Sequence, residues 1–308
     1  MNNILEVNNV VKQYGDYTAL NSVSLQVPKG SIYGLLGPNG AGKTSLIRII
    51  NQITMPDKGE VFLDGEKLAP HHVSYIGYMP EERGLYKTMK VGEQALYLAQ
   101  LKGMPHAEAK KQLKYWFEKF GIEGWWNKKI QELSKGMAQK IQFIVTILHD
   151  PKVLFLDEPT VGVDVQSKNV IINFLKELNT KGTTIIYTSH HLTEAQDFCN
   201  KIAIIDRGTI FAEGKVSDVK KEYRTHKFQV GILSDNVEGL MYDLTQKFTV
   251  GKTTFKSLNN DLKLEIDLGH KTQNELLEVL IKNGQVTHFA ENIPSINDIF
   301  IQTVTNKK

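Results

Sequence analysis

The chain has 308 residues, which at roughly 150 residues per domain suggests two domains. Its 41% hydrophobic and 23% charged residues are ordinary for a soluble globular protein, and a formal net charge of +3 is too small to predict nucleic acid as the main partner. No apolar run approaches the roughly 18 residues of a transmembrane helix, no secretory signal begins the chain, and a single cysteine allows no internal disulfide. We therefore expect a soluble cytoplasmic protein.

Up to about residue 214, short β-rich runs alternate with helical patterns. Segments 32–36, 153–156 and 184–188 are nearly continuous apolar runs, as expected of strands buried on both faces. Each leads into a polar or glycine turn and then a helical pattern, which predicts an α/β fold with functional residues at the strands' carboxyl ends. Residues 88–148 are almost purely helical in pattern and predict a helical subdomain carried on this core.

A glycine-rich segment follows the first of these apolar runs. GPNGAGKT, from Gly37 to Thr44, matches the phosphate-binding pattern G-x-x-x-x-G-K-[ST] at every fixed position. The glycines allow a tight turn that directs backbone N–H groups and the positive end of the next helix at phosphate oxygens. We expect Lys43 to hold the β- and γ-phosphates and Thr44 to bind Mg²⁺. The predicted nucleotide-binding residues here are Gly37, Pro38, Asn39, Gly40, Ala41, Gly42, Lys43, Thr44 and Ser45.

Acidic and imidazole side chains end the next two buried strands. Asp157 and Glu158 close VLFLDEP, and burying two carboxylates there is costly unless a cation pairs with them. A Mg²⁺–triphosphate supplies that cation, with Asp157 reaching the metal through water and Glu158 acting as general base. His190, in TSHH, is placed to reach the γ-phosphate. A surface turn and a structural histidine are the alternatives, and the pair His71-His72 shows no metal-ligand spacing.

A second unit begins near residue 221, so the expected domains are 1–220 and 221–308. Its patterns predict a strand at 226–233, a helix from 237 and a half-exposed strand at 261–268. A second helix follows, with a Thr272–Glu275 capping box at its start and Gly284 at its end, and then a further strand and a last helix. This order resembles the split βαβ motif and predicts a small α+β, ferredoxin-like accessory domain without a catalytic constellation.

The stretch LSKGM, residues 133–137, taken alone is a serine-capped start of an amphipathic helix. Together with the phosphate loop and the paired carboxylates, in this order, it makes residues 4 to 215 resemble the nucleotide-binding subunit of an ATP-binding-cassette (ABC) transporter. LSKGM resembles that family's signature, usually LSGGQ. The resemblance implies a P-loop cassette fold in which Ser134, Lys135 and Gly136 close over the γ-phosphate held by a second subunit, in a head-to-tail dimer with two ATP molecules.

Other positions carry over from the same resemblance. Tyr14 is where the family stacks an aromatic ring on adenine, Asp164 matches the loop that links the two composite sites, and Glu81 stands where glutamine usually couples the nucleotide to the membrane partner. Lys135 and Met137 depart from the usual glycine and glutamine. That variant, with a C-terminal accessory domain, resembles the branch of sodium-extrusion and drug-export ATPase subunits.

The resemblance implies an ATPase that uses ATP and Mg²⁺ to power export through separate transmembrane permease subunits, at the inner face of the cell membrane. One chain holds every part of two composite sites, so we expect a homodimer. A soluble ABC ATPase acting on nucleic acid or ribosomes is an alternative, disfavoured because each motif occurs once and no long heptad repeat is present. Glu158 and His190 argue against a non-catalytic ATP-binding module, and LSKGM against a small-molecule kinase.

Overall fold

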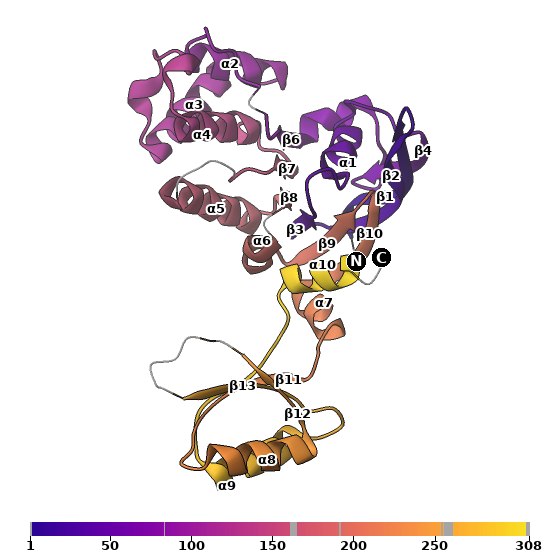
Figure 1. The fold of residues 1–308 in the computed structure, drawn as a ribbon. Coiled ribbons are helices and arrows are strands. Elements are labelled where there is room, and N and C mark those ends of the chain that lie inside the picture. The colour runs from indigo at the N-terminus through magenta and orange to yellow at the C-terminus, as the bar shows by residue number, and fades with distance from the viewer. Residues whose placement is uncertain are drawn as a thin grey trace. The chain divides into compact units, whose positions relative to one another are not determined.

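The computed structural model describes residues 2–82, 84–160, 165–190, 192–253, 255 and 261–305. The chain divides into two compact units, Met1–Val216 and Ser217–Lys308 (Figure 1). Each unit has its own cluster of buried apolar side chains, and the two clusters share no residue. No helix in the described part of the chain is long and apolar enough to cross a membrane.

The first unit contains two sheets. The smaller one is antiparallel, with strand order β2-β1-β4-β5, and its strands are β1 (Asn3–Tyr14), β2 (Tyr17–Pro28), β4 (Lys58–Leu63) and β5 (Glu66–Lys67). The larger one has the order β10-β9-β3-β8-β7-β6 and is parallel except for β10 at its edge. Its strands are β3 (Ile32–Leu36), β6 (Ile76–Met79), β7 (Val153–Asp157), β8 (Thr184–Ser189), β9 (Lys201–Asp206) and β10 (Thr209–Lys215). Every residue of β3, β7 and β8 is buried, so the prediction of three buried strands of an α/β core is confirmed.

Helices and short 3-10 turns complete the first unit. Helix α1 (Lys43–Ile50) directly follows the phosphate loop. Helices α2 (Val91–Leu101), α3 (His106–Phe120) and α4 (Lys135–Ile147) lie together, separate from the small sheet (Figure 1). The other elements are η1 (Pro70–Tyr75), η2 (Glu123–Trp125), η3 (Ile130–Glu132), α5 (Val165–Thr180) and α6 (Leu192–Phe198), while α7 (Val216–Glu222) spans the boundary between the units. Phe120 of α3 stacks on Phe174 of α5 with ring centroids 4.4 Å apart, which joins the helical group to a helix of the core.

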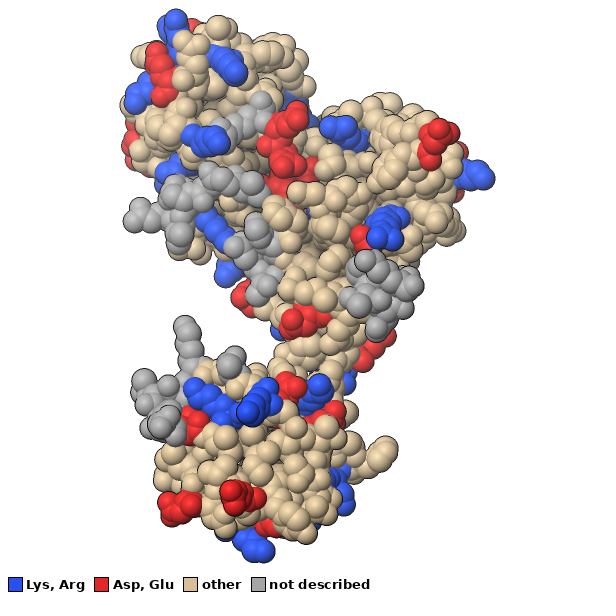
Figure 2. All heavy atoms as spheres, viewed as in Figure 1, with Lys and Arg blue, Asp and Glu red and all other residues tan. Residues whose placement is uncertain are grey.

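The second unit is an α+β fold with one antiparallel sheet in the order β12-β13-β11-β14. Its elements are β11 (Lys227–Leu233), α8 (Val237–Lys247), β12 (Thr249–Lys252), β13 (Leu262–Asp267), α9 (Gln273–Asn283), β14 (Gln285–Glu291) and α10 (Ile296–Thr305). Helices α8 and α9 cover one face (Figure 1), and Leu264 and Ile266 are buried beneath them in a shared core. Figure 2 shows Lys and Arg side chains gathered over β11 and β13.

Candidate active site

The glycine-rich loop after β3 has a backbone conformation and close contacts that require glycine at several positions. Gly40 and Gly42 have φ of 78° and 109°, in the left-handed region where other residues are strained. A Cβ atom on Gly37 would lie 2.1 Å from the carbonyl oxygen of Ile205, and one on Gly42 would lie 2.5 Å from that of Ala19. The loop therefore packs closely against neighbouring backbone and leads into the positive N-terminal end of α1.

Lys43 is the first residue of α1, and its side chain folds back onto this loop. Its Nζ donates hydrogen bonds to the carbonyl oxygens of Gly37 at 2.7 Å and Pro38 at 3.0 Å. Burial lowers the pKa of the Lys43 ammonium, and the nearby carboxylates of Glu158, Asp157 and Glu81 oppose that effect. The site thus places one buried cation among three acidic groups.

Asp157, the last residue of β7, connects three elements. Thr44 Oγ1 on α1 donates to Asp157 Oδ2 at 2.9 Å, and Thr188 Oγ1 on β8 donates to Asp157 Oδ1 at 2.6 Å. The Asp157 side chain is only 2% exposed. A hydroxyl oxygen and a carboxylate oxygen in contact beside a phosphate loop are the hard ligands that Mg²⁺ prefers, so these residues fit the metal predicted for them.

Glu158 follows on a turn with φ of 52°, an uncommon conformation for a residue other than glycine. Its N–H donates to Thr188 Oγ1 at 3.2 Å, which fixes the turn. Its Oε1 lies 2.9 Å from Nδ1 of His190, just beyond β8, and 3.8 Å from Nζ of Lys43. The Glu158 carboxylate is therefore buried and held between an imidazole and an ammonium.

These groups surround a cavity of about 290 Å³. It is lined by Tyr17, Ala19, Asn39, Gly40, Ala41, Gly42, Lys43, Thr44, Ser45, Glu81, Asp157 and Glu158. Most of the predicted phosphate loop, both carboxylates and Glu81 thus meet at one cavity, with His190 in contact with Glu158. Figure 2 shows acidic side chains gathered near β6, where exposed Glu81 and Glu82 follow that strand.

Other predicted site residues lie elsewhere. Tyr14 is not among the described residues lining the cavity; the residue is 42% exposed, and its ring centroid lies 5.4 Å from Nζ of Lys12. Tyr17, which the sequence did not single out, does line it and donates its hydroxyl hydrogen to the Gly40 carbonyl oxygen at 3.0 Å. Asp164 lies outside the residues that the structure describes.

The signature stretch begins α4, away from this cavity. Ser134 Oγ accepts from the Met137 N–H at 3.3 Å, so the predicted helix cap is confirmed. Ser134 and Lys135 are exposed, and with Gly136 they are absent from the described lining of the cavity. The first turn of α4 contains no acidic residue, so no carboxylate within that turn offsets the positive end of the helix.

Two buried glutamines of α4, which the sequence also did not reveal, contact the loops that carry Glu158 and Glu81. Gln139 Nε2 donates to the Pro159 carbonyl oxygen at 2.7 Å, one residue after Glu158. Gln142 Nε2 donates to the Pro80 carbonyl oxygen at 2.8 Å, one residue before Glu81. A single helix therefore carries the signature at its start and supports both acidic loops along its length.

Comparisons with known proteins agree with this geometry. Residues 20–161 match the family model for ABC transporters, and residues 214–304 match that of the ATP-binding protein DrrA1-3-like, C-terminal domain. The chain is 36% identical over 301 residues to the ABC transporter ATP-binding protein YhaQ of Bacillus subtilis (strain 168), covering 98% of both chains. It is 32% identical over 292 residues to the linearmycin resistance ATP-binding protein LnrL of that strain, covering 92% of this chain and 91% of the relative. A dimeric structure of a bacterial ABC transporter cassette aligns with a TM-score of 0.63 and 25% identity, covering 69% of this chain and 98% of that one.

The fold and the site together define a nucleotide-hydrolysing cassette of the P-loop class. A phosphate loop with its lysine, a hydroxyl beside a carboxylate, and a second buried acid directly after that carboxylate in the chain line one cavity. The chain belongs to the ATP-binding proteins of ABC transporters. It hydrolyses ATP to drive transport, in a family whose ATPase subunits dimerise and pair with permease subunits.

Proposed function

We propose that this protein is the ATPase of an export system, working as a homodimer that encloses two Mg²⁺-bound ATP molecules. The observation that supports it most directly is the contact set around Glu158. A buried carboxylate beside a lysine and a histidine, at the edge of a phosphate loop, has the composition of a hydrolytic site and exceeds what ATP binding alone needs.

Within one chain, each site residue receives a role. Thr44 and Asp157 hold Mg²⁺, which when bound neutralises phosphate charge. Lys43 and the loop N–H groups bind the β- and γ-phosphates. Glu158 accepts a proton from the attacking water as general base, and His190 stabilises the γ-phosphate beside that water while orienting the Glu158 carboxylate.

The second copy completes each site. Ser134, Lys135 and Gly136 offer a hydroxyl, a cation and the N-terminus of a helix whose first turn holds no acidic residue, and these suit the γ-phosphate held by the opposite chain. Asp164 links the two sites across the dimer. We assign Tyr14 to stacking on adenine; its cross-strand partner Tyr17 contacts the phosphate loop at Gly40.

An apolar groove beside the Glu81 loop suits the permease partner. It has a volume of about 430 Å³, and its lining includes Ile53, Leu98, Leu101 and Val145. Pro80 and Gln142 also line it, so the groove adjoins the hydrogen bond that supports the Glu81 loop. We assign it to an amphipathic helix of the permease, which places the ATPase at the inner face of the membrane.

Export is supported by the likeness to a linearmycin resistance protein along most of the chain, including the C-terminal region. For that region we infer a split βαβ, ferredoxin-like fold, since the β-α-β-β-α-β element order and the sheet order suit it. We assign the ATPase domain to 1–220, with its helical subdomain at about 88–148, and the accessory domain to 221–308.

The substitution Glu158→Gln tests the catalytic assignment. Because an amide cannot accept the proton, we expect ATP turnover to fall about 100-fold or more while ATP binding persists. Mg²⁺-ATP should then hold the variant as a dimer, measured by light scattering alongside phosphate release. Glu118→Gln, an exposed site on α3, is the matched control. Near-normal turnover in Glu158→Gln would remove Glu158 from the role of base.

Co-purification distinguishes the transport role from a role on ribosomes or nucleic acid. A tagged chain extracted from detergent-solubilised native membranes should retain a stoichiometric polytopic membrane protein. Recovery with ribosomes or DNA-bound proteins instead would contradict the transport assignment and leave the ATPase chemistry intact.

A further inference from the structure

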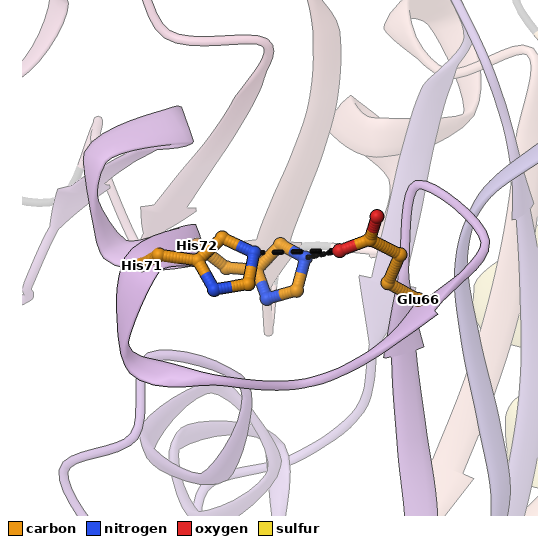
Figure 3. A group of neighbouring side chains, drawn as sticks. All are labelled: Glu66, His71 and His72. Atoms are coloured by element: carbon orange, nitrogen blue, oxygen red, sulfur yellow. Dashed lines mark ion pairs between the residues drawn. The ribbon is translucent and has the colours of Figure 1, made fainter.

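A second cluster of polar side chains lies in the first unit, outside the phosphate loop. Glu66 belongs to β5, and His71 and His72 are adjacent residues of η1. Figure 3 shows both imidazole rings side by side, with a nitrogen of each directed at the same Glu66 carboxylate. The ring centroids of the two histidines are 4.0 Å apart. Two segments are thus joined by three potential metal-ligating side chains.

The distances suit a four-coordinate metal ion. Glu66 Oε2 lies 3.4 Å from Nε2 of His71 and 3.8 Å from Nε2 of His72. Ligands that each lie about 2.0–2.2 Å from a tetrahedral Zn²⁺ are separated from one another by about 3.3–3.6 Å. All three ligand atoms lie within 4.8 Å of one another, so small side-chain rotations bring them to that spacing.

His72 is already held in place. Its side chain is 1% exposed, its Nδ1 accepts a hydrogen bond from the Ala69 N–H at 3.0 Å, and the Ala69 carbonyl oxygen lies 3.2 Å from the same nitrogen. With Nδ1 accepting, a neutral ring carries its hydrogen on Nε2, the nitrogen that faces Glu66. Binding a metal ion through Nε2 requires Nδ1 to carry this hydrogen instead, and the Ala69 carbonyl oxygen is placed to accept it there. A backbone carbonyl that orients a histidine in this way is a usual outer partner of metal-ligating imidazoles.

The other two side chains leave the cluster open to solvent. His71 is 56% exposed and Glu66 is 70% exposed, so an ion can enter and a water molecule can complete its coordination. Two neutral imidazoles and one carboxylate carry a single negative charge. Imidazole ligands favour Zn²⁺ and similar transition metals over Mg²⁺, which prefers oxygen ligands.

We propose that Glu66, His71 and His72 bind a divalent transition-metal ion of the Zn²⁺ class, at a site distinct from the Mg²⁺ that serves ATP. The ion would join β5 to η1, the segment that leads directly into β6.

Zinc binding to the full chain tests the proposal. The measurement is Zn²⁺ competition with a chromophoric chelator, without nucleotide and in excess Mg²⁺, which occupies the oxygen-rich site at Asp157. We expect one Zn²⁺ per chain. His71→Ala and Glu66→Gln should each lower the affinity by at least the about 10–100-fold that loss of an outer partner costs. Both residues are exposed, so these variants should fold normally, and His106→Ala, an exposed histidine on α3, is the control.

Two results would overturn the proposal. One is unchanged Zn²⁺ affinity in both His71→Ala and Glu66→Gln, since direct ligands cannot be dispensable. The other is loss of Zn²⁺ binding in His190→Ala alone, which would place the ion at the ATP site. Co²⁺ substitution gives an independent readout, since the intense visible bands of a four-coordinate ion should vanish in His71→Ala.

Discussion

Asp157 and Glu158 are neighbours in sequence, but the backbone directs their carboxylates to different partners. Asp157 accepts from two threonine hydroxyls, whereas Glu158, on its left-handed turn, faces the histidine and the lysine. Their charges are thus stabilised by separate groups, as expected when one carboxylate binds a metal and the other accepts a proton. The positive φ of Glu158 is a local strain held by the hydrogen bond from its N–H to Thr188.

Glu81 is the exposed acid at the cavity, and its charge acts on Lys43. The Glu81 carboxylate raises the pKa of the Lys43 ammonium, a contribution that Glu81→Gln removes. We expect this substitution to reduce permease-stimulated ATP hydrolysis about 5-fold or more, the lower end of typical coupling energies. The measurement is ATPase activity of the assembled complex. Glu82→Gln, the adjacent exposed acid, is the control, and full stimulation in Glu81→Gln would show that the charge is dispensable.

His149 makes stability depend on pH. Burial and the nearby Lys102 ammonium lower the pKa of its imidazole to about 4 from the ordinary 6.5, and Nε2 lies 3.1 Å from the Ile76 carbonyl oxygen. Between these pH values the unfolded chain binds the proton and the native chain does not, so lowering the pH through this window destabilises the fold by up to about 3 kcal/mol.

The substitution His149→Gln removes this titration while keeping a donor for Ile76. Its free energy of unfolding should therefore decline less between pH 6.5 and 4.5 than that of the native chain, measured by urea denaturation. His106→Gln, an exposed histidine, should leave the slope unchanged. Parallel pH slopes for His149→Gln and the native chain would contradict the assignment of a neutral buried imidazole.

At the scale of elements, the sequence predicts strands and helix ends that follow from short local patterns, and it does not reveal features that depend on contacts with distant segments. The buried strands, the Thr272–Glu275 capping box and the Ser134 cap all follow from short patterns, and the structure contains them. Gly284 does end α9, but its backbone is extended instead of left-handed. A Cβ there would lie 2.2 Å from the Leu233 carbonyl oxygen, so a neighbouring strand requires the glycine, and no local pattern reveals that.

The candidate site shows the same division. The phosphate loop and its acidic residues could be predicted from the sequence because they belong to motifs with fixed spacing. Tyr17 and the glutamines of α4 could not, because they contact their partners only in the folded chain. Gln142 contacts Pro80 across 62 positions and Gln139 contacts Pro159 across 20. The contact of Glu66 with His71 and His72 was likewise hidden, since it depends on how β5 and η1 pack.

Helix α4 supports both acidic loops, and its glutamines can be tested together. Gln139→Leu leaves the buried Pro159 carbonyl, and Gln142→Leu the half-buried Pro80 carbonyl, without its donor, so each should lower the free energy of unfolding by about 1–3 kcal/mol. Gln142→Leu should also weaken permease stimulation, because it releases the Glu81 loop. Urea denaturation and ATPase assays measure the two effects, with Gln100→Leu, exposed on α2, as the control. Equal stability of all three variants would show that these hydrogen bonds do not hold the loops.

At the scale of the whole molecule, the proposed active arrangement needs two chains. One chain presents a phosphate loop with its acids at one place and, at another, a helix start whose capping residue is exposed and whose first turn holds no acidic residue. A two-fold axis that brings the helix start of each chain to the phosphate loop of the other forms two equivalent composite sites from one sequence. Ser217–Lys308 has its own core of buried apolar side chains in each copy.

Mixing two inactive variants tests this arrangement. Lys43→Ala disables the phosphate loop of its own chain, and Ser134→Glu places a carboxylate where the signature should meet the γ-phosphate, so each homodimer lacks any intact site. A mixed dimer regains one, since the loop of the Ser134→Glu chain meets the signature of the Lys43→Ala chain. With random pairing of equal amounts, half the dimers are mixed and each has one of two sites, so phosphate release should recover to about a quarter of normal. Sites completed within one chain would give no recovery at any mixing ratio, because neither variant then supplies what the other lacks.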